Sequence, residues 1–265
     1  MSTITRHIPY ADAHERHIGD LFFPERPLAG APPVLLIHGG GWNAMTKESL
    51  DPIARLATAE GRAVFSINYR LLDHAPWPAC RDDCVAAARF LLADGLAPHG
   101  LAAPATGQLL VVGASAGGHL AMMTGLALGA HACTGIVSLA GPSRVDPRDD
   151  VSKSAICQPG FLAKFFGGDK QPSAVELRDA SPAALVTPAA PPLRILHSKN
   201  DLLVPPTHSE EAAAAWRAAG VPARIDYFDG PGDLHGFWDS DDLAKRELIP
   251  VMAALIREAL ILRLH

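Results

Sequence analysis

The sequence predicts an α/β protein with a mostly parallel central sheet, helices on both faces of that sheet and a short lid insertion. Short apolar runs of strand length alternate with longer amphipathic stretches, which is the pattern of a parallel sheet covered by helices. Most runs are continuously apolar, as expected of strands buried on both faces. With 265 residues, 48% of them hydrophobic, the chain can bury a large core. We therefore expect one domain over residues 1–265.

Eight strands are expected, beginning with two edge strands at residues 3–10 and 17–23. A segment that contains proline and glycine, residues 24–33, joins them to the main sheet. The other six strands are apolar runs bounded by turn residues. They are residues 33–38 (PVLLIH), 63–68 (AVFSIN), 108–113 (QLLVVG), 134–140 (TGIVSLA), 193–198 (LRILHS) and 223–228 (ARIDYF).

Amphipathic stretches between these runs predict the helices that cover the sheet. Gly220 and Pro222 follow the fourth of them, where a helix should stop. The expected helices are residues 46–60, 78–93, 116–128, 207–219 and 241–262.

Residues 141–192 break the alternation, because they are rich in proline and carry consecutive charges at residues 148–150. A connection of this length without clear secondary structure is typical of a functional lid or binding loop. We expect a lid-like excursion that lines a site, and a solvated surface insertion is the alternative.

Charge and composition exclude several classes of protein. The chain has 23 Lys and Arg against 28 Asp and Glu, a net charge of −5, and no basic run, so nucleic acid is not an expected partner. No apolar stretch approaches the roughly 20 residues that span a bilayer, which excludes membrane insertion. The amino terminus is polar where a signal peptide is apolar, and the four cysteines are irregularly spaced, so we expect a reduced, cytoplasmic protein.

Cys80 and Cys84 are four residues apart on an expected helix, a spacing that two metal ligands can have. No second pair with matching spacing is present, so we interpret both as small packing residues. We therefore expect neither a metal nor a cofactor. The oligomeric state is open, and a homodimer is compatible with the sequence.

A candidate nucleophile follows the expected strand at residues 108–113. The motif GASAG at residues 113–117 fits G-x-S-x-G and is followed at once by a helical pattern. In such a strand-to-helix turn, small flanking glycines let the backbone bend sharply and hold the serine hydroxyl exposed. The motif therefore predicts Ser115 as a nucleophile.

A glycine loop, HGGGW at residues 38–42, follows the first strand of the main sheet. The tetrahedral intermediate of acyl transfer carries a negative oxygen, which preorganised backbone N–H groups stabilise. We expect Gly40, Gly41 and Ala116 to supply these groups as an oxyanion hole, since glycine does not obstruct the approach. The alternative is a tight turn or an anion-binding glycine loop.

A serine nucleophile needs a base and a group that orients the base, in the chain order Ser, Asp, His for a sheet of this kind. Asp201 follows the strand at residues 193–198, and His235 follows the last strand. Both would lie at the edge of the sheet that holds Ser115. We predict Asp201 as the orienting carboxylate and His235 as the general base.

Other acids and histidines of these segments fit less well. Asp226, Asp229 and Asp233 are rivals to Asp201 as the orienting carboxylate. Asp226, however, belongs to a strand, and the other two crowd the loop of the predicted base. His197 lies within a strand, too early for the base, and His38 is expected to brace the glycine loop through a hydrogen bond.

Two tryptophans adjoin the predicted site. Trp42 follows the glycine loop, and Trp238 lies three residues after His235. Both are predicted to bind substrate by walling the acyl or alcohol pocket, with core packing as the alternative.

Over essentially its whole length the chain resembles the α/β-hydrolase superfamily. The segments YRL at residues 69–71 and PWPA at 76–79, with Asp83 after them, are similar to a segment of hormone-sensitive-lipase-like esterases and their bacterial relatives. That segment is mainly structural in those enzymes. The resemblance implies a buried arrangement of Arg70 and Asp83.

Two further features refine the resemblance. Ala114 stands where the lipase-like group usually has an acid, and HSKND at residues 197–201 is more similar to the bacterial feruloyl/acetyl-esterase-like group, BD-FAE, and to kynurenine formamidases. In both groups the positions of Ser115, Asp201 and His235 form a catalytic triad. Ser198 replaces a glycine that is common there, a change that keeps the carboxylate position but can alter the path of the loop.

The resemblance implies a serine carboxylic-ester hydrolase that acts on small acyl or aryl esters through an acyl-enzyme. An arylformamidase is the alternative within hydrolases, because the same residues cleave both bonds. A ligand-binding pseudohydrolase is the alternative from another class. Such proteins typically lose the nucleophile or the base, and both are present in this sequence.

Overall fold

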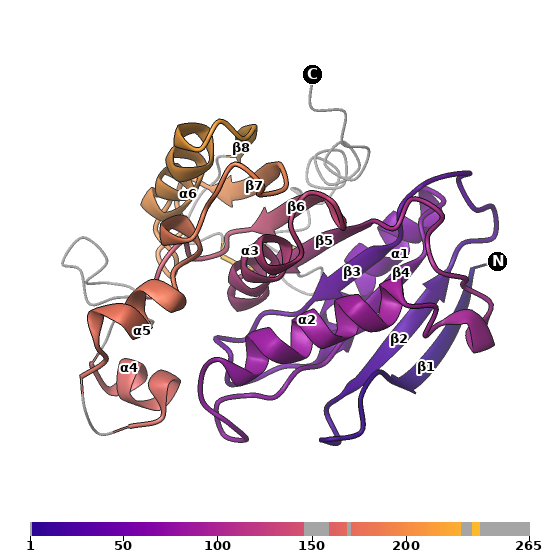
Figure 1. Ribbon diagram of the computed structural model, residues 1–265, viewed down its shortest axis with the longest axis horizontal. Coiled ribbons are helices and arrows are strands. Elements are labelled where there is room, and N and C mark those ends of the chain that lie inside the picture. Colours follow the sequence, from indigo (N-terminus) through magenta and orange to yellow (C-terminus); the bar gives the residue numbers. More distant parts are fainter. Residues whose placement is uncertain (1, 146–158, 169–170, 229–234, 239–265) are drawn as a thin grey trace.

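The computed structural model describes residues 2–145, 159–168, 171–228 and 235–238. Within these residues eight strands form one sheet, and all eight expected strands are present (Figure 1). The pairs β1–β2 and β2–β4 are antiparallel and the other neighbours are parallel, so the sheet is mostly parallel as predicted. In sheet order the strands are β1 (Thr3–Pro9), β2 (Ile18–Phe23), β4 (Val64–Ile67), β3 (Val34–Ile37), β5 (Leu109–Ala114), β6 (Cys133–Leu139), β7 (Leu193–Ser198) and β8 (Ala223–Phe228).

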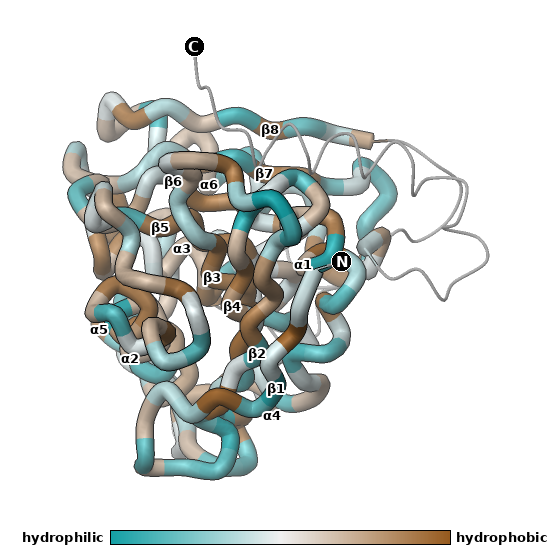
Figure 2. The backbone as a smooth tube through the Cα atoms, turned by 90° about the vertical axis from the view of Figure 1, so that its right-hand side faces the viewer, coloured by the Kyte–Doolittle hydropathy of each residue, from teal (hydrophilic) through white to brown (hydrophobic). Residues whose placement is uncertain are grey.

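Helices cover both faces of the sheet, and the core is divided accordingly. Leu35 and Ile37 of β3 belong to one apolar cluster with α2, α3 and α6, whereas Val34 and Leu36 belong to a second cluster with α1. Alternate residues of a strand thus reach opposite faces. Figure 2 shows β3 and β4 as strongly hydrophobic parts of the interior. The helices are α1 (Asp51–Ala59), α2 (Ala79–Leu92), α3 (Ala116–Leu128) and α6 (Thr207–Ala218).

The helix expected at residues 46–60 is divided into a 3₁₀ turn, η1 (Lys47–Leu50), and α1. Pro52 explains the division, because it lacks the N–H that would continue the helical ladder back to Glu48. In the first turn of α1 that missing donor costs nothing. The helix expected at residues 241–262 lies outside the described residues.

Residues 141–192 were expected to lack clear secondary structure, but the structure contains two short helices there, α4 (Pro159–Phe166) and α5 (Ala174–Asp179). The start of α5 is a capping box, in which the Ser173 hydroxyl accepts from the N–H of Glu176 and the Glu176 carboxylate accepts from the N–H of Ser173. The two capping-box residues can be recognised in the sequence, but the prolines around them led us to expect no helix there.

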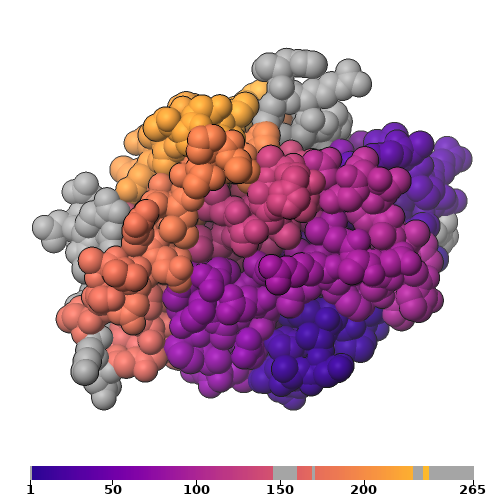
Figure 3. Space-filling view, in the orientation of Figure 1, coloured from indigo at the N-terminus to yellow at the C-terminus, as the bar shows by residue number. Residues whose placement is uncertain are grey.

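Aromatic contacts hold this excursion against the body of the protein. Trp77 stacks on Phe165 of α4 with ring centroids 5.4 Å apart, and the backbone N–H of Trp77 donates to the Phe165 carbonyl at 2.8 Å. His119 of α3 lies with Nε2 2.8 Å from the carbonyl oxygen of Ala180, just after α5. Figure 3 shows the salmon surface of this region lying beside the purple surface of the preceding segments. Its function as a lid stays a prediction.

Candidate active site

Ser115 lies in the tight turn between β5 and α3, with φ 54° and ψ −122°. A non-glycine residue at positive φ is strained, and such strain recurs at functional sites. The glycines on either side make the turn possible. A Cβ at Gly113 would lie 2.0 Å from the carbonyl oxygen of Gly117, and a Cβ at Gly117 would lie 2.2 Å from that of Ile37. The GASAG motif therefore admits no larger residue at either glycine.

Ser115, His235 and Asp201 form a continuous hydrogen-bonded chain. Nε2 of His235 lies 2.9 Å from Oγ of Ser115, and Nδ1 of His235 lies 2.7 Å from Oδ2 of Asp201. An ionised carboxylate can only accept, so Nδ1 carries the proton and Nε2 is left to accept the proton of the Ser115 hydroxyl. A general base needs this arrangement.

Four N–H groups converge on the Asp201 carboxylate. The backbone N–H groups of Leu203 and Val204 each donate to Oδ1 at 2.9 Å, while His197 and His235 lie 3.1 and 2.7 Å from Oδ2. Burial alone would raise the pKa of Asp201, but hydrogen bonds from His197 and His235 outweigh it and hold that pKa well below its ordinary value. Asp201 is therefore ionised at neutral pH. The sequence excluded His197 as the base and did not predict its contact with Asp201.

One rival to Asp201 is engaged elsewhere. Asp226 of β8 accepts from Nε of Arg194 at 2.6 Å and from Nε of Arg224 at 2.8 Å. These ion pairs account for a buried carboxylate on an edge strand. The other rivals, Asp229 and Asp233, lie outside the described residues.

The glycine loop after β3 lies against the nucleophile, since a Cβ at Gly39 would be 3.2 Å from Cβ of Ser115. Gly40 and Gly41 have φ values of +97° and +58°, which glycine adopts without strain. Ala116 is the first residue of α3, so its N–H has no acceptor within the helix. Among the described residues, none accepts from the N–H groups of these two glycines or of Ala116. An oxyanion hole at these groups stays a prediction.

The carbonyl of Gly39 is held by two donors. Nδ1 of His38 lies 2.7 Å from it, and the Tyr69 hydroxyl shares its one proton between this carbonyl at 3.2 Å and that of His38 at 3.1 Å. The C=O and N–H of a trans peptide point in opposite directions, so fixing this carbonyl also fixes the direction of the Gly40 N–H. His38 thus braces the glycine loop, as expected.

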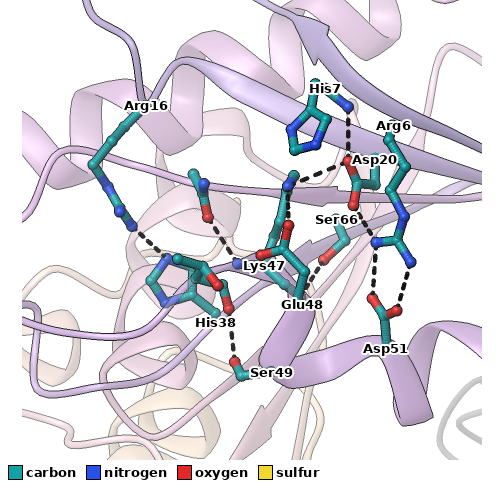
Figure 4. A network of polar contacts seen from close by, with 12 residues as sticks. Arg6, His7, Arg16, Asp20, His38, Lys47, Glu48, Ser49, Asp51 and Ser66 are labelled. Carbon is teal, nitrogen blue, oxygen red and sulfur yellow. Dashed lines mark hydrogen bonds and ion pairs between the residues drawn. The ribbon is translucent and has the colours of Figure 1, made fainter.

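Arg16, in the loop between β1 and β2, completes the brace (Figure 4). Its Nη2 lies 3.3 Å from Nε2 of His38 and 3.0 Å from the Met45 carbonyl, and its Nε donates to the Tyr69 carbonyl at 2.7 Å. A guanidinium can only donate, so Nε2 of His38 accepts and Nδ1 carries the proton. Burial lowers the pKa of His38 to about 3, which keeps the ring neutral near pH 7. No sequence motif indicates Arg16.

A group of ion pairs in Figure 4 anchors the chain as it leaves the glycine loop. The buried Nζ of Lys47 lies 3.3 Å from Oδ1 of Asp20, and Lys47 also pairs with Glu48. Arg6 bridges Asp20 and Asp51. These contacts tie β1 and β2 to the start of α1, and they fix the chain that follows the glycine loop relative to the sheet.

The two tryptophans differ in placement. Trp238 is half-buried, and its ring lies edge-on to that of His235 with centroids 5.4 Å apart, beside the candidate site. Trp42 has 0% of its surface exposed and packs against His119 and Phe165. The structure thus favours the packing alternative for Trp42, and the substrate-binding role of Trp238 stays a prediction.

The implied pair of Arg70 and Asp83 is present. The Arg70 guanidinium binds the buried Asp83 carboxylate through Nε and Nη2, at 2.9 and 2.6 Å, and is itself only half-buried. Its backbone N–H also donates to Asp83 at 2.8 Å.

The described cysteines, Cys80, Cys84 and Cys133, are buried free thiols. Burial raises the pKa of Cys80 and of Cys133 to about 12, so both are protonated thiols at neutral pH. In the described ranges, no three His, Cys, Asp or Glu side chains gather as a metal site would require. No helix within the same ranges is long and apolar enough to cross a membrane.

The strand order, with a strained serine turn after β5 and a glycine loop after β3, is that of an α/β-hydrolase. Residues 20–216 match the BD-FAE family model, and the chain belongs to the BD-FAE family. This match confirms the resemblance that the sequence indicated.

Curated relatives are similar over most of this chain. Esterase LipC of Mycobacterium tuberculosis is 28% identical over 228 residues, which cover 80% of this chain and 55% of LipC. Esterase LipQ of the same organism is 27% identical over 88% of this chain and 57% of its own length. The chain therefore spans little more than half the length of these relatives.

Solved structures share the fold. A truncated carbohydrate esterase from gut microbiota aligns with a TM-score of 0.77 at 21% identity, over 98% of this chain and 97% of that one. An esterase of Pyrobaculum calidifontis aligns with a TM-score of 0.76 at 23% identity, over 97% and 85%. At these identities the likeness shows the fold alone.

Proposed function

We propose that the protein is a serine carboxylic-ester hydrolase in which Ser115 is the nucleophile, His235 the general base and Asp201 the orienting carboxylate. The observation that carries this proposal is the unbroken hydrogen-bonded chain from Ser115 Oγ through His235 to Asp201, at 2.9 and 2.7 Å. Membership of the BD-FAE family and similarity to proteins named as esterases support it.

The geometry implies a two-step mechanism. Nε2 of His235 takes the hydroxyl proton as Oγ of Ser115 attacks the ester carbonyl, and the resulting oxyanion accepts from the N–H groups of Gly40, Gly41 and Ala116. The imidazolium then gives its proton to the leaving alcohol, and an acyl-enzyme remains. Water, deprotonated by the same imidazole, releases the acid and restores the serine.

Small acyl or aryl esters are the proposed substrates. The Trp238 ring beside His235 offers an apolar edge against which such a group can pack. No observation in the structure favours the arylformamidase alternative, which therefore serves as an outcome of the test.

A substrate panel tests the proposal. Nitrophenyl esters of increasing acyl length and methyl hydroxycinnamates are compared with an aryl formamide, using Ser115→Ala as the control for background hydrolysis. We expect turnover of one or more esters by the wild type and none above background by the variant. Hydrolysis of the formamide without any ester turnover would overturn the proposal.

We further infer that residues 1–265 form one domain, that residues 141–192 serve as a lid, and that the protein works in the cytoplasm. The buried free thiols support a reducing compartment, because none of the described cysteines is paired. Cell fractionation tests the location.

A homodimer stays a prediction, which sedimentation at several concentrations tests.

A further inference from the structure

A second histidine contacts the carboxylate of the triad. His197 of β7 has no exposed side-chain surface, and its Nε2 lies 3.1 Å from Oδ2 of Asp201 and 2.9 Å from the carbonyl oxygen of Val204. Its Nδ1 lies 2.5 Å from Oγ of Ser209 on α6. Both ring nitrogens are thus engaged, so the ring is fixed in its plane between β7 and α6.

The hydrogen-bond partners define what His197 donates. Nε2 faces two acceptors, a carboxylate oxygen and a carbonyl oxygen, so it carries a proton. Nδ1 is then the acceptor of the neutral ring, and the Ser209 hydroxyl donates to it. The Nε2–H of His197 is thus shared between the carbonyl oxygen of Val204 at 2.9 Å and Oδ2 of Asp201 at 3.1 Å.

His197, His235 and two backbone N–H groups together fill the Asp201 carboxylate. A carboxylate has about four lone-pair positions. Two on Oδ1 are taken by the backbone N–H groups of Leu203 and Val204, and one on Oδ2 is taken by His197. The single remaining position faces His235, so Nδ1–H of that ring has one direction in which to point. Its Nε2 is then held toward Ser115.

We infer that His197 is a positioning residue, which sets both the orientation and the charge of the Asp201 carboxylate that His235 meets. This inference rests on the proposed esterase function. A donor on Oδ2 withdraws negative charge from that oxygen, so it limits how strongly Asp201 stabilises protonated His235. Among the described residues, the titratable groups in contact with this carboxylate are His197 and His235, and α6 contributes the uncharged Ser209.

The test is the pH profile of kcat/KM for His197→Leu, which keeps bulk and removes the donor. Without that donor Asp201 presents more charge to His235, protonated His235 is better stabilised, and the acid limb moves to higher pH by about 0.5 unit or more. Loss of orientation lowers kcat roughly tenfold, with little change in KM. The amide N–H of the variant His197→Gln reaches a similar position. This variant should therefore recover most of kcat and return the acid limb most of the way to its wild-type pH.

A matched control separates this role from simple loss of a buried histidine. His208 is also fully buried on α6, and its Nδ1 accepts from the N–H of Ser143 rather than contacting the triad. We expect His208→Leu to lower stability and to leave the acid limb in place. If His208→Leu moves the limb as His197→Leu does, or if His197→Leu leaves it unmoved, the inference is overturned.

Two measurements keep the inference testable under other outcomes. If His197→Leu does not fold, Ser209→Ala takes its place and should move the acid limb in the same direction by less; an unmoved limb overturns the inference. If the wild type hydrolyses no ester, the proposed function fails, but the downfield proton resonance of His235 Nδ1–H still reports on Asp201. It should shift in His197→Leu, and an unchanged resonance contradicts the positioning role.

Discussion

Nδ1 of His235 lies 2.7 Å from Oδ2 of Asp201, although 34 residues separate the two in the chain. Replacing Asp201 with Asn puts an amide where Oδ2 now accepts from two imidazoles, and the amide NH₂ cannot accept. His235 would be driven to the tautomer that cannot take the Ser115 proton. We expect Asp201→Asn to lower kcat by roughly 10⁴-fold with the fold retained, as measured by steady-state kinetics and circular dichroism. A variant that keeps a tenth of wild-type kcat would contradict the role of Asp201.

The lowered pKa of Asp201 also makes a prediction about stability. The folded protein favours the ionised form of the Asp201 carboxylate. The contribution of this carboxylate to the free energy of unfolding is therefore complete above its ordinary pKa of 3.8, and it is lost as pH falls through the lower pKa that Asp201 has in the folded protein. The stability advantage of the wild type over Asp201→Asn should therefore shrink below about pH 4. Urea unfolding of both proteins at pH 6 and pH 3 measures it. An advantage of equal size at both pH values would count against the carboxylate contacts.

The glycine loop offers a matched pair of substitutions. A Cβ at Gly40 would lie 2.2 Å from the carbonyl oxygen of Ala44, whereas a Cβ at Gly41 would meet no atom within 4 Å. Gly40→Ala must therefore displace the loop, and we expect kcat to fall by about 100-fold or more. Gly41→Ala meets only the strain of positive φ, about 1–2 kcal/mol, and should lose much less activity. Steady-state kinetics and thermal melting give kcat and the melting temperature of each variant. Equal losses of kcat in the two variants would contradict this account of the loop.

The brace formed by Arg16 predicts an effect on catalysis from a residue remote from the serine. A lysine at this position cannot reach His38, Met45 and Tyr69 together, so the direction of the Gly40 N–H is less well fixed. We expect Arg16→Lys to lower kcat by about 5- to 50-fold while KM changes little. The exposed Arg55 supplies the control, and Arg55→Lys should behave as the wild type. If Arg16→Lys raises KM and leaves kcat unchanged, the brace does not serve the oxyanion loop.

The parts of the fold that follow from local pattern were predictable. The six strands of the main sheet were read as apolar runs between turn residues, and their positions agree with the structure to within a residue or two. Ser115 was predictable for a similar reason, because G-x-S-x-G records a steric need that Gly113 and Gly117 meet in the structure. Asp201 and His235 were predicted from strand order, and the structure places His235 in contact with Ser115 and Asp201 in contact with His235.

The parts that depend on distant contacts were not predictable. Arg16 acts on a loop more than 20 residues away. His197 is only four residues from Asp201, but the two side chains meet because the turn after β7 folds back on the strand, which no local pattern indicates. Trp42 adjoins the glycine loop in sequence, but its φ of +57° belongs to a turn that leaves the ring buried in the core. Adjacency in sequence does not fix the direction of a side chain.

The central claim is that Ser115 is activated by His235, and covalent labelling tests it most directly. A fluorophosphonate forms a P–O bond with an activated serine and releases fluoride, so intact-protein mass spectrometry counts the adducts and peptide mapping locates them. We predict one adduct, mapped to Ser115, on the wild type and on the exposed-serine control Ser49→Ala. Ser115→Ala should carry no adduct, and His235→Ala should be labelled slowly. An adduct at another serine, or equal labelling of Ser115→Ala, would contradict the claim.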